Sequence, residues 1–181
     1  FNLGGRANFD NALLAYAGGS TPIEGATANF NTIEMHEADL RVSDSRFEYN
    51  ASGATGSNRN GRGNNDGAVV FVRGAQPTIV NNVFEDNDGS VISIDANALE
   101  AISVTDLGRT TGPVDAHTQF ADNQGPLVRL NRMDNITSGF NGTLGMEIRP
   151  NELTTASIWD DTDIVHVMSS GKIYIDNQHA R

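Results

Sequence analysis

Short runs of alternating apolar and polar residues recur along this chain at regular offsets, and they predict a stack of parallel strands. Residues 33–50 (IEMHEADLRVSDSRFEYN) align with residues 70–87 (VFVRGAQPTIVNNVFEDN) when the numbering is shifted by 37. The matched apolar positions are Ile33 with Val70, Met35 with Val72, Val42 with Ile79 and Phe47 with Phe84. Alternation with a period of two is typical of strands, and its return at a fixed offset is typical of repeat proteins.

A second alignment, at an offset of 36, extends the pattern towards the C-terminus. It matches Phe84 with Phe120, Asn87 with Asn123, Gly89 with Gly125, Ile92 with Val128 and Ile94 with Leu130. The shortest step, from Gly67 to Gly89, spans 22 residues, so the bare repeat is predicted to be about 22 residues long. The longer steps then carry two inserted loops, at residues 51–65 and 98–116.

This pattern predicts an all-β fold, a parallel β-helix solenoid in which each coil stacks on the previous one. Nothing recurs at the 3.6-residue spacing of a helix. In a stack of parallel strands, equivalent side chains form columns along the axis. Asparagine tolerates a left-handed backbone and can bond to the amide stacked above it, so a turn ladder is predicted beside an aromatic column. The predicted aromatic column is Phe47, Phe84 and Phe120, and the predicted ladder is Asn50, Asn87 and Asn123. The alternative is that Asn and Gly recur merely because both favour turns.

The whole chain, residues 1–181, is predicted to form one domain. Residues 33–150 hold the repeated coils, and residues 151–181 form a terminal coil with short strands at 164–167 and 173–175. Residues 1–32 are a first coil or a cap. Within them, residues 11–19 (NALLAYAGG) form either a strand or a short capping helix, and the strand is favoured. The opening FNLGGRANFD does not resemble a translation start, so we expect a processed chain or a piece of a longer protein.

Residues 77–89 (PTIVNNVFEDNDG) resemble the coils of the right-handed parallel β-helix superfamily typified by pectate lyases. Residues 30–53 and 158–168 (IWDDTDIVHVM) resemble segments of very large secreted repeat proteins of planctomycete-like bacteria. The first resemblance implies a right-handed β-helix over about residues 25–150. The second implies an extracellular or cell-surface location.

Composition and charge narrow the classes of partner. The 19 glycines and the 38% hydrophobic content favour many short strands joined by turns. The net charge of −11 disfavours binding to nucleic acid or to an anionic membrane surface. No apolar run approaches the ~20 residues that a spanning helix needs, so no membrane insertion is predicted. The chain has no cysteine, which excludes disulfides and thiolate metal sites.

The strand alternation also predicts a candidate ligand face. If Met35, Val72, Ile94, Leu130 and Ile148 point inward, the residues that follow them point outward. Those outward residues are His36, Arg73, Asp95, Asn131 and Arg149. A parallel outward column precedes the inward positions and contains Glu34, Phe71, Ser93, Arg129 and Glu147. We expect Arg73 to lie close enough to Asp95 to pair with it, with His36 on the other side of Arg73. The alternative is an ordinary solvated sheet face with mixed charges.

Sequence motifs for catalysis and metal binding are sparse. The polygalacturonase-like pattern requires an Asp-Asp pair, a His-Gly and an Arg-Ile-Lys, and only Asp160–Asp161 matches. Two acidic turns could supply oxygen ligands to calcium, although neither matches an EF-hand loop and solvated turn acids are the alternative. The calcium candidates are Asp86, Asp88, Asp160, Asp161 and Asp163. No His spacing indicates zinc.

Two functional hypotheses follow. The first is a non-catalytic structural or adhesive module of an extracellular protein, which stacks head-to-tail on further coils or on copies of itself. The second is a polysaccharide lyase or hydrolase, or a glycan-binding module, that uses the outward His36, Arg73 and Asp95 face with calcium.

Overall fold

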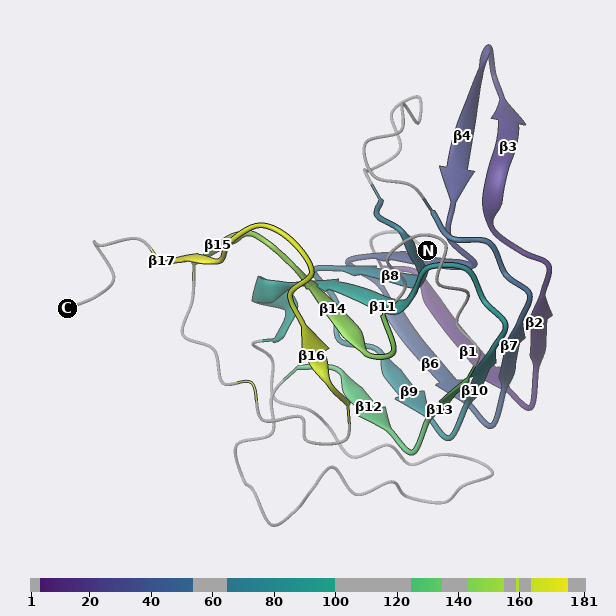
Figure 1. The fold of residues 1–181 in the computed structure, drawn as a ribbon. Helices are drawn as coiled ribbons and strands as arrows, with labels where there is room; N and C mark the ends of the chain where they lie inside the picture. Colours follow the sequence, from purple (N-terminus) through teal and green to yellow (C-terminus); the bar gives the residue numbers. More distant parts are fainter. Residues whose placement is uncertain are drawn as a thin grey trace.

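A computed structural model describes residues 4–53, 65–99, 125–134, 143–154, 159 and 164–175. Over these ranges the chain is all-β, with one short 3₁₀ helix, η1 (Ala96–Leu99), and most strands pair in parallel (Figure 1). Within the same ranges, no helix is long and apolar enough to cross a membrane.

The strands form three parallel sheets and two small two-stranded ones. Sheet I contains β1 (Arg6–Asp10), β6 (Asp39–Ser43), β9 (Thr78–Val80) and β12 (Leu127–Arg129). Sheet II contains β2 (Leu13–Ala15), β7 (Arg46–Glu48), β10 (Val83–Glu85) and β13 (Arg132–Asp134). Sheet III contains β5 (Ile33–His36), β8 (Ala68–Arg73), β11 (Ser90–Asp95), β14 (Met146–Arg149) and β16 (His166–Val167). The small sheets are the antiparallel pair β3 (Gly19–Ile23) and β4 (Ala26–Phe30), and the parallel pair β15 (Glu152–Leu153) and β17 (Tyr174–Ile175).

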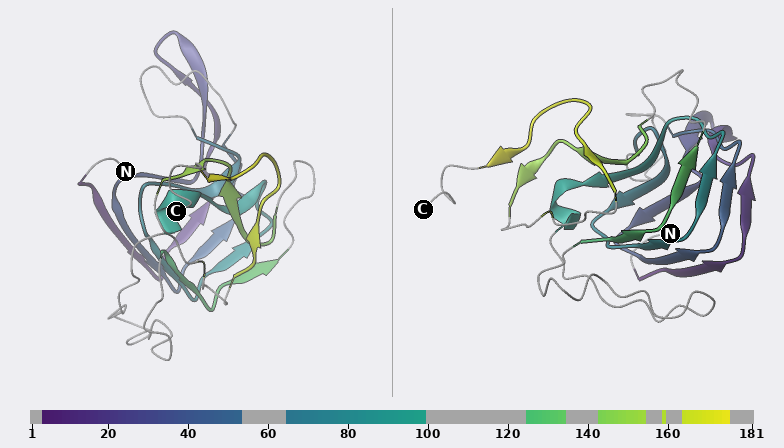
Figure 2. Two further views of the ribbon diagram at one scale, coloured as in Figure 1. Left: turned by 90° about the vertical axis from the view of Figure 1, so that its left-hand side faces the viewer. Right: turned by 60° about the horizontal axis from the view of Figure 1, so that its bottom comes forward.

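The chain visits the three sheets in a fixed order, and each passage through sheets III, I and II is called a circuit here. Strands β5, β6 and β7 make one circuit and β8, β9 and β10 make the next, after which β11 returns to sheet III. Figure 2 shows the strands of successive circuits lying side by side, with the β3–β4 hairpin projecting from them. This topology is compatible with a β-helix.

The predicted strand register is confirmed for the central circuits. Ile33 pairs with Val70, Val42 with Ile79, and Phe47 with Phe84, which is the offset of 37. Ser90 pairs with Ala68, which is the step of 22 residues. Residues 11–19 also contain the favoured strand rather than a helix, because Leu13, Leu14 and Ala15 pair with β7.

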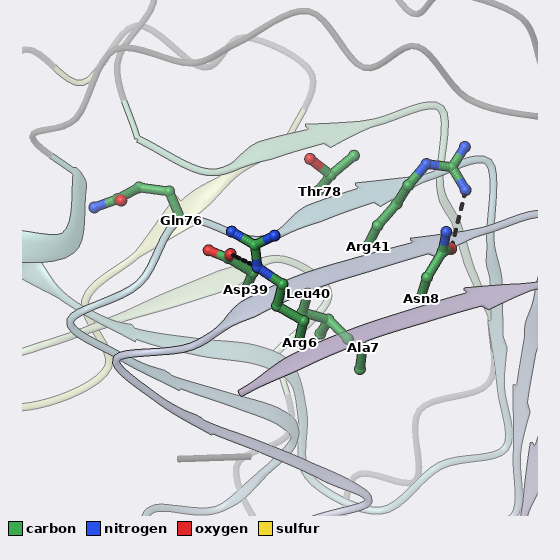
Figure 3. A pocket seen from close by; sticks show the side chains of 8 residues that line it. All are labelled: Arg6, Ala7, Asn8, Asp39, Leu40, Arg41, Gln76 and Thr78. Atoms are coloured by element: carbon green, nitrogen blue, oxygen red, sulfur yellow. Dashed lines mark hydrogen bonds and ion pairs between the residues drawn. The ribbon is translucent and has the colours of Figure 1, made fainter. Parts of the chain in front are cut away.

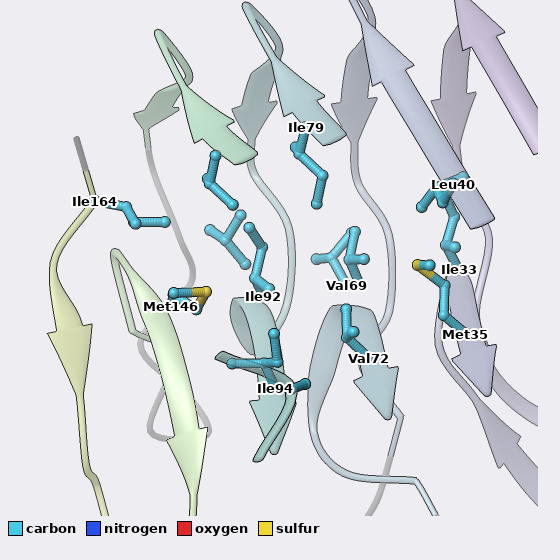
Figure 4. Packing of buried hydrophobic residues seen from close by; sticks show 14 of the residues in the cluster. Ile33, Met35, Leu40, Val69, Val72, Ile79, Ile92, Ile94, Met146 and Ile164 are labelled. Carbon is cyan, nitrogen blue, oxygen red and sulfur yellow. The ribbon is translucent and has the colours of Figure 1, made fainter. Parts of the chain in front are cut away.

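Apolar side chains fill the space between the sheets. Met35, Val72 and Ile94 follow one another across sheet III and are buried, as their alternation predicts (Figure 4). Ile148, which pairs with Ile94, continues this buried row. Phe47 and Phe84 are fully buried and their rings stack 4.5 Å apart. At about 25 cal/mol per Å² of apolar area removed from water, this cluster is the main favourable contribution to folding.

The alignment at an offset of 36 is wrong. Phe84 pairs with Met133, and Ile92 with Met146, so neither is matched as predicted. Val128 pairs with Ile79 of sheet I, and Leu130 is exposed, with a φ of 58°, in the turn between β12 and β13. Short apolar alternations fit any strand of the stack equally well, so a long insertion lets a segment be assigned to the wrong sheet. Phe120 and Asn123 lie outside the described residues.

Three columns of residues with positive φ mark the turns between sheets. They are Gly4, Glu37 and Gly74; Asn11, Asp44, Asn81 and Leu130; and Tyr16, Tyr49 and Asp86. The predicted ladder residues Asn50 and Asn87 are therefore not left-handed themselves, because each follows the left-handed residue. That position places the asparagine side chain inside the turn, where it can reach the backbone of the neighbouring circuit.

The asparagine ladder connects neighbouring circuits by hydrogen bonds. The Asn50 side chain donates to Oδ1 of Asn87 at 2.9 Å, and the Asn50 backbone N–H donates to the same oxygen at 3.1 Å. The Asn87 side chain donates to the carbonyl of Phe47 at 2.7 Å. A second ladder repeats this arrangement between Asn82 and Asn131, where the side chain of Asn82 donates to Oδ1 of Asn131 at 3.0 Å. These bonds satisfy turn amides that would otherwise be buried without partners.

Candidate functional site

The outward side of sheet III brings together most of the predicted ligand face. His36 lies next to Arg73 in the paired strands β5 and β8, and Asp95 lies next to Arg149 in β11 and β14. Val72 pairs with Ile94, so Arg73 and Asp95 follow paired residues on neighbouring strands. Asn131 does not belong to this face, because it lies in the second asparagine ladder between sheets I and II. The register error at β12 misplaced it.

The second outward column of sheet III is confirmed in part. Glu34 pairs with Phe71, Phe71 with Ser93, and Ser93 with Glu147. Arg129 is not part of it, since β12 belongs to sheet I. Phe71 is only 3% exposed and Ser93 is fully buried, although both point away from the interior of the stack. This is therefore not an ordinary solvated sheet face.

Arg149 is the centre of this buried face. Its guanidinium carbon lies 4.1 Å from the centroid of the Phe71 ring. Its Nη1 donates to Oγ of Ser93 at 3.1 Å, and its Nη2 donates to the carbonyl of Val72 and lies 3.6 Å from Oδ1 of Asp95. Both side chains of the ion pair are largely buried, at 14% and 15% exposure. Such a guanidinium is held by an aromatic face, a hydroxyl, a carbonyl and a carboxylate together.

The electrostatics of Arg149 follow from its burial. Loss of hydration lowers the pKa of Arg149 to about 10, while the carboxylates of Asp95, Asp66 and Glu147 act in the opposite direction. The side chain therefore stays charged at neutral pH. A buried cation is stable only when protein groups replace its lost hydration. Arg149 has several such partners, so it is suited to a structural role in holding this face of the sheet together.

A second polar group borders Phe71 on the side of β5. Nε2 of His36 lies 3.6 Å from Oε2 of Glu34, and the His36 ring packs against Phe71 with centroids 5.4 Å apart. Oε1 of Glu34 accepts hydrogen bonds from the Asn31 backbone at 3.1 Å and from the Asn65 side chain at 3.2 Å. These bonds fix the Glu34 carboxylate in one orientation, which in turn positions His36.

A cavity of about 260 Å³ opens beside this face. Its lining residues are Asn65, Asp66, Phe71, Arg73, Asp95, Arg149, Pro150 and Asn151. The positive charges of two arginines and the negative charges of two aspartates in this lining are equal in number. Arg73 is exposed, and its guanidinium has no ion-pair or hydrogen-bond partner among the described residues. The cavity could hold a carboxylate at Arg73, whereas it offers no cysteine or serine nucleophile at its lining.

The structure describes only two of the five predicted calcium ligands. Asp86 and Asp88 lie in the turn after β10. Among the described residues, no group of three or more His, Asp or Glu side chains could hold a metal ion. Asp160, Asp161 and Asp163 lie outside the described residues, so calcium binding by that turn stays a prediction.

A second cavity, of about 480 Å³, lies over the outer side of sheet I and was not predicted (Figure 3). Arg6 and Asp39 form an exposed ion pair at 3.0 Å on one side of it, and Arg41 donates to Oδ1 of Asn8 at 3.5 Å on the other. The available sequence signal was the alternation of outward polar residues in residues 6–10 and 39–43. That signal places the residues on one face but says nothing of a hollow between them.

No known family, curated protein or solved structure matches the chain. The membership of the pectate-lyase-like superfamily, which the resemblance implies over about residues 25–150, therefore stays a prediction.

Proposed function

We propose that this chain is a right-handed parallel β-helix module with a structural or adhesive role at a cell surface or outside the cell. In this proposal it joins further coils, or copies of itself, through the open ends of its sheets. Support comes from the repeated order of sheets III, I and II and from the in-register pairing of equivalent strands. The asparagine ladders add support, because they serve only to connect one circuit to the next.

The observation that carries the proposal is the apolar character of both ends of the stack. At one end, β1 and β2 are edge strands of sheets I and II, and Leu13 on β2 is 64% exposed. At the other end, β16 is the edge strand of sheet III, flanked by the exposed side chains of Val165 and Met168. An open strand edge beside exposed apolar side chains is a surface on which another strand can pair.

In such an association the first end of one copy meets the second end of another, which is a head-to-tail contact. Contacts of this kind give a closed ring or an open filament, depending on the rotation between copies. Partly buried core side chains at the β1–β2 end also favour the addition of another coil. Phe9 and Leu14 are only partly buried although they pack against the core, because no strand covers β1 and β2 on their outer side among the described residues. A further coil would bury these side chains completely.

Light scattering after size separation, across a concentration series, tests this proposal. We expect the mean mass to rise with concentration. Leu13→Lys and Val165→Lys, at opposite ends, should each abolish the rise, because either one places a charge in the interface. Thr21→Lys lies on the β3–β4 hairpin, which projects sideways from the stack (Figure 1), so it adds the same charge outside the strand edges and should leave the rise unchanged. A wild-type chain that stays monomeric at every concentration would contradict the proposal.

The cavity on sheet III favours a second candidate function, the binding of an acidic glycan. The supporting observation is the exposed guanidinium of Arg73 in the cavity wall, since a bidentate arginine suits a uronate carboxylate. Calorimetric titration with oligogalacturonate, with and without calcium, should then give saturable binding that Arg73→Ala removes. Arg6→Ala, an exposed arginine on sheet I, is the matched control. Unsaturated products, followed by ultraviolet absorbance, would reveal lyase activity.

A further inference from the structure

Tyr16 and Tyr49 form an exposed aromatic stack on the outside of the molecule. Their ring centroids lie 5.4 Å apart, with an angle of 12° between the ring planes. Tyr16 is 80% exposed and Tyr49 is 52% exposed. The stack follows from the register of sheet II, because each tyrosine comes directly after a strand and Ala15 pairs with Glu48. Burial does not explain why these positions are aromatic.

Backbone preference does not explain the two tyrosines either. Tyr16 has a φ of 55° and Tyr49 a φ of 52°. A bulky residue is strained in this region of backbone conformation, and glycine or asparagine would avoid most of the strain. The equivalent turn between sheets I and II uses Asn11, Asp44 and Asn81 in three of its four described positions, and Leu130 in the fourth. Strained, exposed aromatic residues therefore remain where small polar ones would give a more stable turn.

Asp86 occupies the next position of the same column, and it differs from the neighbouring carboxylates in its lack of a cationic partner among the described residues. Glu48 and Glu85 both pair with Arg46, and Asp134 pairs with Arg132 at 2.7 Å. Asp86 has no cationic partner among the described residues. Its negative charge instead acts on the neighbouring phenol and raises the pKa of Tyr49 above its ordinary value of 10.0.

Sheet III supplies an internal example of how such an arrangement is completed. There, the small residue Ser93 follows Phe71 in the column. The guanidinium of Arg149 lies over that ring, 4.1 Å from its centroid, and pairs with Asp95. The Tyr49 column has the same aromatic ring followed by a smaller residue with a carboxylate, but no cation of the described chain lies there.

We propose that Tyr16, Tyr49 and Asp86 form a binding site for a guanidinium or ammonium group, supplied by an arginine- or lysine-bearing segment of a partner protein. The cation lies against the tyrosine rings and pairs with the Asp86 carboxylate. Ring faces attract cations through their quadrupole, and arginine stacks on them most readily. The net charge of −11 adds long-range attraction for a basic partner. Tyr16 directly follows the edge strand β2, so the site borders the end that is proposed to associate, but cation binding itself needs no open strand edge.

The probe for the experiment is a tetra-arginine peptide, titrated into the full chain at low ionic strength while the tyrosine ring resonances are followed by NMR. The chain has three tyrosines, so each resonance can be assigned with a single Tyr→Phe variant. We expect the rings of Tyr16 and Tyr49 to shift in a saturable manner while Tyr174 stays unchanged. Tyr174 is a matched internal control, because it is also exposed and lies far along the chain on β17.

Two variants make the test specific. Asp86→Asn should weaken peptide binding about fivefold, which corresponds to the ~1 kcal/mol of a partly exposed charge pair. Asp88→Asn, two residues away, removes the same charge and should leave the affinity unchanged. As a second readout, bound peptide should lower the pKa of Tyr49, since a cation offsets the effect of Asp86.

Three results would overturn the proposal. Equal shifts at Tyr16, Tyr49 and Tyr174 would indicate only general attraction between a basic peptide and an acidic protein. An unchanged affinity in Asp86→Asn would remove the carboxylate from the site. Larger shifts with a neutral oligosaccharide such as xylopentaose than with the peptide would instead identify a sugar-stacking surface.

Discussion

Two aromatic pairs of this molecule differ in where they lie: Phe47 and Phe84 stand on strands and face the interior, whereas Tyr16 and Tyr49 lie in the turns that follow strands. Phe47 and Phe84 stack at 4.5 Å and are completely buried, whereas Tyr16 and Tyr49 stack at 5.4 Å and are exposed. Both pairs have an angle of 12° between ring planes, because both are placed by the parallel register of sheet II. Register therefore aligns the rings, and burial decides whether the alignment contributes to stability.

The buried pair should show the largest effect of any substitution. Phe47→Ala removes a ring that is enclosed between Leu14 and Phe84 of the adjacent circuits. We expect the free energy of unfolding to fall by about 3–5 kcal/mol, because the lost apolar burial adds to the cost of a cavity in a rigid stack. Urea unfolding followed by circular dichroism measures it. A loss below about 1 kcal/mol would mean that the column is not packed as described.

The asparagine ladder should come next. Asn87→Ala leaves the backbone N–H and the side chain of Asn50 without their acceptor, and the carbonyl of Phe47 without its donor. At roughly 1–3 kcal/mol for an unsatisfied buried group, with some relief from relaxation, we expect a loss of about 2–4 kcal/mol. Asn8→Ala is the matched control, since Asn8 is exposed on β1, and it should change stability by less than about 0.5 kcal/mol.

The buried face of sheet III gives an intermediate case, because there the aromatic ring is covered by a charge. Arg149→Ala uncovers Phe71, and among the described residues it leaves Asp95 with only its hydrogen bond from the Gly74 backbone. We expect the free energy of unfolding to fall by about 2–3 kcal/mol, which is less than for a fully enclosed ion pair because both side chains keep some exposure. Arg6→Ala breaks a fully solvated pair with Asp39 and should cost less than about 1 kcal/mol.

The exposed tyrosine pair should contribute little to stability. Tyr16→Ala removes one ring of the stack, but this ring is already exposed, so little buried apolar area is lost. We therefore expect the free energy of unfolding to change by no more than about 0.5 kcal/mol. The same urea titration that is used for Phe47→Ala checks it. A loss comparable to that of Phe47→Ala would show that the two stacks are energetically alike, which would end the comparison.

The sequence was sufficient for the central circuits because two kinds of signal agreed there. Apolar alternation and the repeated spacing of Phe and Asn both match residues 33–50 with 70–87, in spite of the inserted loop at residues 51–65 between them. Beyond residue 99 the insertion removes the spacing, and alternation alone cannot distinguish one strand of the stack from another. Leu130 and Asn131 were misplaced for that reason.

The chemistry of the candidate site was predicted less well than its location. Alternation correctly placed His36, Arg73, Asp95 and Arg149 on one side of sheet III. It gave no sign that Phe71 and Ser93 on this side are buried, because Arg149 reaches back across Ser93 to cover Phe71. Contacts that cross several strands have no signature in a local pattern. The Tyr16 and Tyr49 stack was missed because tyrosines 33 residues apart match no motif.

The smallest predicted effect concerns the ionisation of Tyr49, and it probes the exposed stack without disturbing the fold. Asp86→Asn should lower the pKa of Tyr49 towards 10.0, because the carboxylate charge is the main cause of its elevation. In the wild-type chain the folded state holds the phenol proton more tightly than the unfolded state does. The stability from this group is therefore complete below pH 10 and is lost as the pH rises through the elevated pKa.

The ring carbon resonances of Tyr49, followed through an alkaline titration, measure this shift directly. Asp88→Asn controls for the general effect of removing one negative charge from an acidic protein. If both variants shift the pKa equally, the influence on Tyr49 comes from net charge rather than from its neighbour in the column. If only Asp86→Asn does so, the Asp86 carboxylate itself acts on Tyr49, and the outer aromatic pair differs from the inner one in having a carboxylate with no cationic partner among the described residues.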